Sequence, residues 1–303
     1  MRSETLRAAL HDRPLLADGA MGTQLMQAGL RAGECAELWN VDALARVAAV
    51  HRAYVDAGAE LVLTNTFGGS SATLERHGLA ARAAELNRAG AALAREAVGR
   101  RAWVLGDIGP CGEFLEPLGA LSRGDAEAMF AEQAAALAEG GADGLIVETM
   151  TDPQELAAAV RAADRTGLPV LASFAFDAAG ETDFRTMMGA APEDAVRAAV
   201  EAGAEVVGAN CGTALDLEAY ARLAEALLAA GDGVPVILQP NAGRPMLIDG
   251  RETFAVTPAQ MGAAVASLVK AGVRVVGGCC GSTPAHVRAM AEALATSCPQ
   301  GET

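Results

Sequence analysis

Three cysteines carry the most suggestive chemistry in this sequence. Cys211 stands in the segment GANCG, and Cys279 and Cys280 form an adjacent pair in GGCCG. Three thiolates make a soft ligand set that suits zinc, with Zn–S distances of about 2.3 Å and a tetrahedral preference. Three protein ligands leave one coordination position open, which is typical of a catalytic zinc site. The alternative is that the cysteines are small buried apolar residues, since free cysteine is often buried.

Four segments with a common spacing connect these cysteines to other polar residues. The second residue of each segment is a helix-ending glycine, and a short run rich in Val, Ile and Leu follows. These glycines are Gly58, Gly141, Gly203 and Gly272. The segments are AGAELVLTNTF from 57, GGADGLIVETM from 140, AGAEVVGANCG from 202 and AGVRVVGGCCG from 271. Seven residues after the four glycines come Asn65, Glu148, Asn210 and Cys279, and one residue later come Thr66, Thr149, Cys211 and Cys280. All eight are polar or sulfur-bearing, so we expect them to converge at one end of a sheet.

Four further apolar runs fit between these segments, so the sequence predicts eight strands. The runs are PLLADG near 14, AWVLGDIG near 102, PVLASFAF near 169 and PVILQPN near 235. Helical periodicity fills the intervals, over 43–57, 81–98, 123–139, 153–166, 192–202, 216–230, 257–271 and 284–295. This alternation is typical of a parallel sheet, and eight such units in roughly 280 residues favour a closed barrel over an open sheet. We therefore expect a single (β/α)8 TIM barrel domain over residues 1–303, of the α/β class, with its active site at the carboxyl ends of the strands.

Composition and charge exclude several classes of partner. The net charge of −15 and the lack of a basic stripe disfavour nucleic acid and anionic membrane surfaces. The apolar runs are far shorter than the roughly 20 residues of a membrane span. The amino-terminal stretch does not resemble a secretory signal, so we expect a cytoplasmic protein, in which the six cysteines would not form a disulfide framework.

Two further groups complete the expected site. Glu148 would be a poorly solvated carboxylate, which a substrate ammonium group or a neighbouring arginine could neutralise. Asp18, Gly19 and Ala20 follow the first strand, where small residues let backbone N–H groups face a carboxylate. Cys111, in GDIGPCGEF, falls at the same end of the sheet, but the surrounding glycine and proline suffice to explain a tight loop. We therefore leave Cys111 outside the ligand set, and whether it approaches the zinc stays open.

The order of these motifs resembles the homocysteine S-methyltransferase family. That family includes the homocysteine-binding barrel of cobalamin-dependent methionine synthase, together with betaine-dependent and S-methylmethionine-dependent enzymes. The resemblance spans about residues 15 to 295. It rests on ADGAMGTQL at 17, LTNTFGGS at 63, GDIGP at 106, ET at 148, GANCG at 208, QPNAG at 239 and GGCCGSTPAHVRAM at 277.

The resemblance implies a role for each matching residue. Cys211, Cys279 and Cys280 would bind zinc. Asp18 and Gly19, in the loop that continues to Ala20, would hold the amino-acid end of homocysteine, with Glu148 on its amino group. In the methionine synthase branch the Asn of PNAG can fill the fourth zinc position before substrate arrives, and Asn241 matches it. A zinc-bound homocysteine thiolate would then attack a methyl donor and form methionine, because coordination deprotonates a thiol whose free pKa is about 8.5.

The methyl donor stays open at this stage. Betaine enzymes surround their cationic donor with aromatic residues, whereas TNTFGGS and VETMT supply Gly and Thr here, and Trp39 is the one obvious aromatic candidate. The chain lacks the Asp-x-His-x-x-Gly cobalamin motif and the length for folate or corrinoid domains. We therefore favour a methylcorrinoid, methylcobalamin, carried by a separate corrinoid protein. Betaine and S-methylmethionine are the alternative donors.

Two other classes of protein are weighed against the methyltransferase. A non-catalytic zinc-binding or thiol-binding barrel would keep the three cysteines but would not need Glu148 or the Asp18 loop. An aldolase or decarboxylase barrel would present a Lys or His at a strand end. The only lysine, Lys270, lies inside a predicted helix. The sequence therefore favours the methyltransferase over both alternatives.

Overall fold

Eight parallel strands form the centre of the computed structural model, which describes residues 4–213, 215–244, 246–248 and 251–297. The strands are β1 (Leu15–Leu16), β2 (Leu61–Leu63), β3 (Trp103–Ile108), β4 (Gly144–Met150), β5 (Val170–Phe174), β8 (Val206–Asn210), β9 (Val236–Gln239) and β12 (Val275–Val276). They pair in the order β1-β12-β9-β8-β5-β4-β3-β2. A parallel bridge between Ala17 and Leu61 joins the two ends of this order. The predicted (β/α)8 barrel is confirmed.

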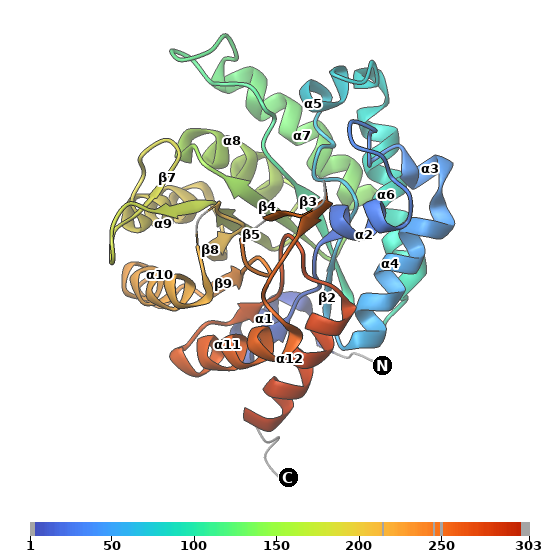
Figure 1. Cartoon of the computed structure of the whole chain (residues 1–303). Helices are drawn as coiled ribbons and strands as arrows, with labels where there is room; N and C mark the ends of the chain where they lie inside the picture. The colour runs from blue at the N-terminus through green and yellow to red at the C-terminus, as the bar shows by residue number, and fades with distance from the viewer. Residues whose placement is uncertain (1–3, 214, 245, 249–250, 298–303) are drawn as a thin grey trace.

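Helices surround the strands, as Figure 1 shows. The main ones are α4 (Leu44–Ala57), α6 (Ala83–Val98), α7 (Arg123–Glu139), α8 (Pro153–Asp164), α9 (Pro192–Ala202), α10 (Leu217–Ala230), α11 (Pro258–Ala271) and α12 (Pro284–Ser297). Their bounds agree with the predicted ranges to within about two residues, because glycines and capping residues mark them in the sequence. Gly58, Gly203 and Gly272 end their helices in the left-handed region, and Thr257 caps α11 with Gln260 in a capping box. Within the described ranges, none of the helices has the length and apolar character needed to cross a bilayer.

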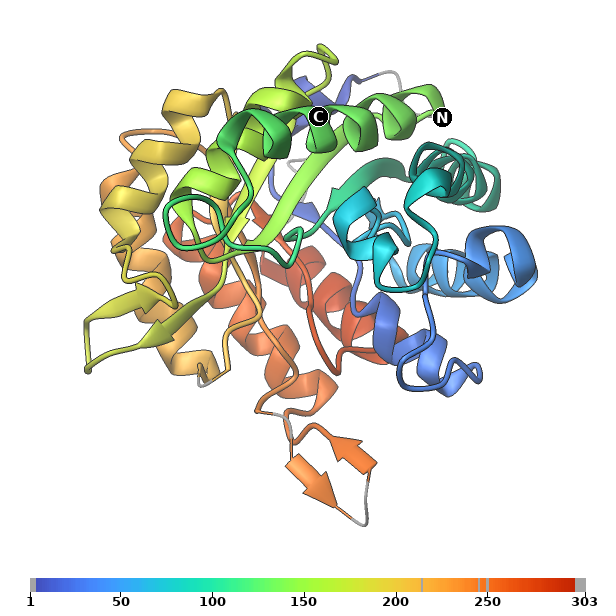
Figure 2. The same cartoon turned by 90° about the horizontal axis from the view of Figure 1, so that it is seen from above.

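Short elements between strands and helices were not predicted, because they are too brief to show periodicity. They are α1 (Leu6–Asp12), α2 (Met21–Gln27), α3 (Trp39–Asp42), α5 (Ser71–Glu75), η1 (Ala80–Arg82), and the strand pairs β6 (Phe176–Ala178) with β7 (Phe184–Thr186) and β10 (Met246–Ile248) with β11 (Arg251–Thr253). The two antiparallel pairs project from the body of the molecule, β10–β11 in orange and β6–β7 in yellow-green in Figure 2.

The interior of the barrel is built in two layers. Alternate residues of each strand point inward, and one layer of them is apolar, including Leu105 of β3, Leu171 of β5 and Ile237 of β9. Leu6 and Leu10 of α1 belong to the same cluster and cover it at the amino ends of the strands. Farther along the same faces the residues become polar or sulfur-bearing, at Asp107, Glu148, Ser173, Asn210, Gln239 and Cys279. The fold therefore places a polar layer at the carboxyl end of the barrel.

Candidate active site

The three cysteines meet at this carboxyl end. The Sγ atoms of Cys211, Cys279 and Cys280 all lie within 4.8 Å of one another. Sulfur atoms around a tetrahedral zinc with bonds of about 2.3 Å would be roughly 3.8 Å apart. A contraction of an ångström or less would therefore suffice to coordinate a zinc ion. Across the described residues, no histidine or carboxylate joins this group of potential metal ligands.

Unusual backbone angles turn the strand ends toward the cysteine cluster. Cys211 has φ = 58° and Thr149 has φ = 61°, in the left-handed region that non-glycine residues rarely adopt. The hydroxyl of buried Tyr220 donates to the Cys211 carbonyl, and Asn210 Oδ1 accepts from the Thr149 N–H at 2.9 Å. Neighbouring side chains thus hold both turns in place, as is common where strain positions functional groups.

Close packing between the β1 and β12 loops places the cysteine pair. Ser282 Oγ accepts from the Ala20 N–H at 3.0 Å and donates to the Cys279 carbonyl at 2.7 Å. A Cβ at Gly19 would lie 2.6 Å from Ser282 Oγ, and one at Gly278 would lie 2.5 Å from it. Glycine is therefore required at both positions for the two loops to approach.

The thiols hold their protons unequally in this arrangement. Hydrogen bonds from Cys279 and Cys280 lower the pKa of Cys211 to about 3. The hydrogen bond to Cys211 raises the pKa of Cys280 to about 12 and that of Cys279 well above its ordinary value. Among the three thiols, Cys211 therefore holds its proton least tightly, and a bound cation would compete with the thiol protons for the sulfur atoms.

Asn241 lies beside the sulfur atoms. Its Nδ2 is 3.9 Å from Cys211 Sγ and donates to the Gly212 carbonyl at 3.0 Å. Its Oδ1 is buried and has no hydrogen-bond partner within the described part of the chain. An unpartnered buried oxygen is costly, so a side chain that carries one and lies beside Cys211 fits a site that holds a zinc ion.

A cavity of about 340 Å³ opens beside the cysteine cluster. Its walls come from the carboxyl ends of seven barrel strands and the segments that follow them, and they include Gly19, Ala20, the 63–67 segment, Asp107, Glu148 and the three cysteines. Among the described residues that line it, there is no arginine, lysine or histidine. The cavity therefore presents sulfur and carboxylate groups without an opposite charge from the protein.

Buried carboxylates give the cavity its acidic character. Burial, together with the charge of Cys211, raises the pKa of Glu148 to about 8. Burial and the charge of Glu148 raise the pKa of Asp107 well above its usual range. Asp18 is buried too, with Oδ2 accepting from the Leu63 N–H at 3.0 Å and Oδ1 unpartnered among the described residues. The adjoining Gly19 and Ala20 line the cavity, whereas Asp18 lies behind its wall.

Comparison with known proteins identifies the family. A family model described as "Homocysteine S-methyltransferase" matches residues 15–294. The chain belongs to this family. It is 34% identical over 307 residues to the methionine synthase of Mycobacterium tuberculosis, covering 94% of this chain and 25% of that protein. It is 33% identical over 323 residues to the methionine synthase of Mycobacterium leprae, covering 98% of this chain and 26% of that protein. The chain thus spans about a quarter of the length of these relatives.

Solved structures of the same family have a similar fold. The homocysteine methyltransferase MmuM from Escherichia coli, in its oxidised form, is 25% identical and superposes with a TM-score of 0.75, covering 95% of this chain and 99% of that one. The metallated form of that protein is 23% identical and superposes with a TM-score of 0.74, covering 93% of this chain and 96% of that one. The resemblance predicted from the motifs is therefore confirmed at the level of the family.

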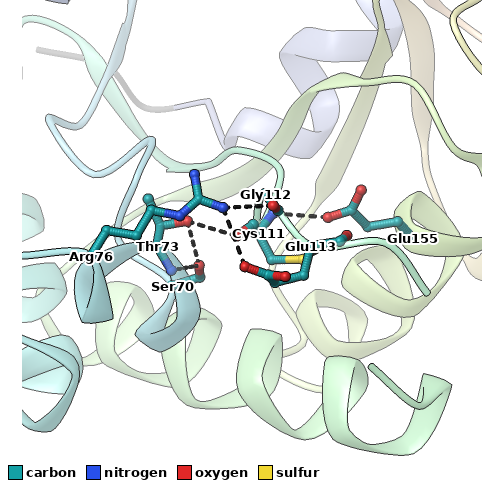
Figure 3. Close-up of polar contacts among 7 residues, drawn as sticks. All are labelled: Ser70, Thr73, Arg76, Cys111, Gly112, Glu113 and Glu155. Atoms are coloured by element: carbon teal, nitrogen blue, oxygen red, sulfur yellow. Dashed lines mark hydrogen bonds and ion pairs between the residues drawn. The ribbon is translucent and has the colours of Figure 1, made fainter. Parts of the chain in front are cut away.

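Cys111 has a structural environment outside the sulfur cluster, as Figure 3 shows. Its backbone N–H donates to Glu155 at 2.8 Å, its carbonyl accepts from Thr73 Oγ1 at 3.0 Å, and its thiol contacts the Glu113 carbonyl at 3.6 Å. Arg76 forms an ion pair with Glu113 at 3.3 Å. Burial raises the pKa of Cys111 to about 12. Its exclusion from the ligand set is consistent with these contacts, which secure the β3–α7 loop.

Sequence reasoning missed three polar residues of the inner layer. Asp107 and Gln239 line the cavity, and Ser173 donates to Asn210 Oδ1 at 2.7 Å. All three lie on strands β3, β5 and β9, which do not follow one of the four repeated glycine-containing segments. Counting seven residues from the glycines of those segments therefore does not identify them. The alternation of inward-facing residues was the available signal, since each lies two positions after a buried leucine or isoleucine on the same strand.

Proposed function

We propose that this chain is a zinc-dependent homocysteine S-methyltransferase that forms methionine. The observation that carries the proposal is the convergence of the Cys211, Cys279 and Cys280 sulfur atoms within 4.8 Å beside an acidic cavity. Family membership supports the acceptor chemistry. The proposal places the protein in the cytoplasm, where reducing conditions keep unbound cysteines as thiols.

The three cysteines would hold the zinc ion, with Asn241 Oδ1 available as a fourth ligand before substrate binds. Bound zinc would supply Lewis-acid character that keeps a substrate thiol deprotonated at neutral pH. The protein contributes the positions of its sulfur atoms, set by the turns at Cys211 and by the packing of Gly278 against Ser282.

The cavity would receive homocysteine with its amino-acid end toward the β1 loop and β4. Glu148 supplies a carboxylate for the ammonium group, because no basic side chain among the described lining residues competes for it. Gly19 and Ala20 line the part of the cavity that would receive the substrate carboxylate. The Ala20 N–H donates to Ser282 Oγ, and Asp18 supports the loop from behind. In the reaction the sulfur forms a bond to the methyl carbon, the donor–carbon bond breaks, and its electron pair leaves with the donor. The thiol proton departs beforehand, so no base is needed at the methyl group.

We further propose that a methylcorrinoid on a separate protein supplies the methyl group. Six large apolar side chains are exposed on the segments that follow the barrel strands: Met26, Phe67, Phe114, Leu118, Met187 and Met246. Such a rim suits contact with a large carrier. Phe67 is the one aromatic residue among the described lining residues, so the aromatic cage that a quaternary ammonium donor favours is not assembled there. Trp39, the aromatic candidate from the sequence, instead stacks with Arg46, at 5.1 Å.

The decisive experiment compares donors in parallel. Zinc-loaded protein is incubated with homocysteine and methylcobalamin, betaine or S-methylmethionine, and methionine is measured by mass spectrometry. We expect slow turnover with methylcobalamin, and none in a Cys279→Ser/Cys280→Ser variant. Saturable turnover with betaine or S-methylmethionine alone would move the enzyme to the small-donor group. Zinc binding without turnover with any donor, including a corrinoid carrier protein, would support a non-catalytic thiol-binding barrel instead.

A further inference from the structure

Asp107 is held rigidly in the wall of the cavity. Its backbone N–H donates to Thr64 Oγ1 at 2.9 Å, and its carbonyl accepts from Thr66 Oγ1 at 2.7 Å. The two threonines follow β2, so the neighbouring strand fixes the main chain of Asp107 on both sides. Its side chain is only 5% exposed and lines the cavity.

The buried Asp107 carboxylate lacks the hydrogen-bond donors and the positive charge that would stabilise it. Its Oδ1 has no hydrogen-bond partner in the described ranges, and no described lining residue carries a positive charge. Gln239 Oε1, in the same lining, is also unpartnered within those ranges. A buried carboxylate without donors is costly. Both unpartnered atoms are acceptors, so the complementary ligand is a cation with several N–H donors.

Asp107 lies next to Glu148 on the inner face of the barrel. Asp107 pairs across β3 and β4 with Ile146, which is two residues before Glu148 and therefore has the same inward orientation. The charge of Glu148 acts on Asp107 more strongly than that of Asp18 does. Three carboxylates line the cavity: Asp107, Glu148 and Glu37. Glu37 already accepts from the Gly68 N–H at 2.8 Å, so Asp107 and Glu148 are the adjacent pair on the inner face of the barrel.

We propose that Asp107, together with Glu148, binds the α-ammonium group of the substrate and makes the site selective for amino-acid thiols over simple thiols. This inference rests on the proposed homocysteine methyltransferase function. A primary ammonium supplies one positive charge and three N–H donors, which match the carboxylates and the nearby acceptor. The amide of Asn at position 107 keeps the shape of the side chain but removes its charge.

The test compares homocysteine with 4-mercaptobutanoate, which is the same molecule without the amino group. Binding of both thiols to zinc-loaded protein is measured by titration calorimetry, and zinc content is determined for every variant. We expect Asp107→Asn to weaken homocysteine binding by about 10- to 100-fold, as loss of a charge-assisted hydrogen bond implies. Binding of 4-mercaptobutanoate should remain unchanged or improve, because that ligand places no ammonium near the carboxylates. Asp107→Ser provides a second variant that also lacks the charge.

Glu155→Gln is the matched control. Glu155 is a buried carboxylate that accepts from the Cys111 N–H outside the cavity, so its replacement should leave the preference between the two thiols unchanged. Equal loss of affinity for both thiols in Asp107→Asn would indicate a structural role and overturn the inference. Retention of the wild-type preference in both Asp107 variants would also overturn it, while leaving the proposed function intact. If the wild-type zinc protein bound neither thiol, the proposed function itself would fail, and this inference with it.

Discussion

Replacement of Asn210 by Ala tests how the site is assembled, because this one side chain joins three strands. Asn210 is 1% exposed at the end of β8. Its Oδ1 accepts from the Thr149 N–H at 2.9 Å and from Ser173 Oγ at 2.7 Å. Its Nδ2 donates to Thr149 Oγ1 at 2.6 Å and lies 3.7 Å from Cys279 Sγ. Asn210 thus connects Thr149, the residue after Glu148, with Cys279, one of the proposed zinc ligands.

The expected cost follows from the groups that Asn210→Ala would leave without partners. The Thr149 N–H and the Ser173 hydroxyl would each lose their acceptor, at about 1–3 kcal/mol for each buried group. Thr149 lines the cavity, so water can replace the donor that its Oγ1 loses at little cost. We therefore expect the free energy of unfolding to fall by about 2–6 kcal/mol. Release of Thr149 from its left-handed conformation should also move Glu148 and weaken homocysteine binding.

Urea-induced unfolding, followed by the fluorescence of the two tryptophans, measures the stability, and titration calorimetry measures homocysteine binding. Ser173→Ala is the matched control, because it removes one hydrogen bond and leaves the Asn210–Thr149 contacts in place. Its expected cost is about 1 kcal/mol, without a loss of affinity for homocysteine. If Asn210→Ala cost less than about 1 kcal/mol and bound homocysteine normally, the assignment of Asn210 as the connecting residue would be wrong.

Three further predictions concern the metal, the substrate and pH. Purified protein should hold about one zinc per chain, and replacement of Cys211, Cys279 or Cys280 by Ser should sharply lower zinc affinity. Zinc content is measured by elemental analysis. Full zinc occupancy in the Cys279→Ser/Cys280→Ser variant would refute the ligand assignment. Glu148→Ala should weaken homocysteine binding in calorimetry and leave zinc content nearly unchanged, whereas loss of both would indicate a structural role. His51 is fully buried, its two ring nitrogens have no partner among the described residues, and burial lowers its pKa from 6.5 to about 4. The unfolded chain therefore binds more protons between pH 6.5 and 4, so His51 should remove about 3 kcal/mol of stability as the pH falls through that window. Unfolding of wild type and His51→Leu at pH 7 and pH 5 checks this, and parallel pH dependences would contradict it.

The sequence alone determined the architecture to a large extent and predicted which cysteines would come together. Helix-ending glycines, capping residues and short Val- and Ile-rich runs are local signals, and each acts within a few residues of the element that it marks. They placed the eight strands and eight main helices correctly. The equal spacing from glycine to polar residue then predicted that Cys211 and the Cys279–Cys280 pair would meet, because parallel strands of a barrel end on one face.

Only the tertiary structure decided which polar atoms lack partners. Asp107 and Asp18 are both aspartates after apolar runs, yet Asp107 lines the cavity and Asp18 lies behind it. Trp39 and Cys111 were candidates from their positions in the sequence, and both face structural partners instead of the cavity. These outcomes depend on contacts between residues far apart in the chain. The periodicity of a strand predicts which face a side chain points to. It does not predict the hydrogen-bond partner of that side chain, because the partner belongs to another strand.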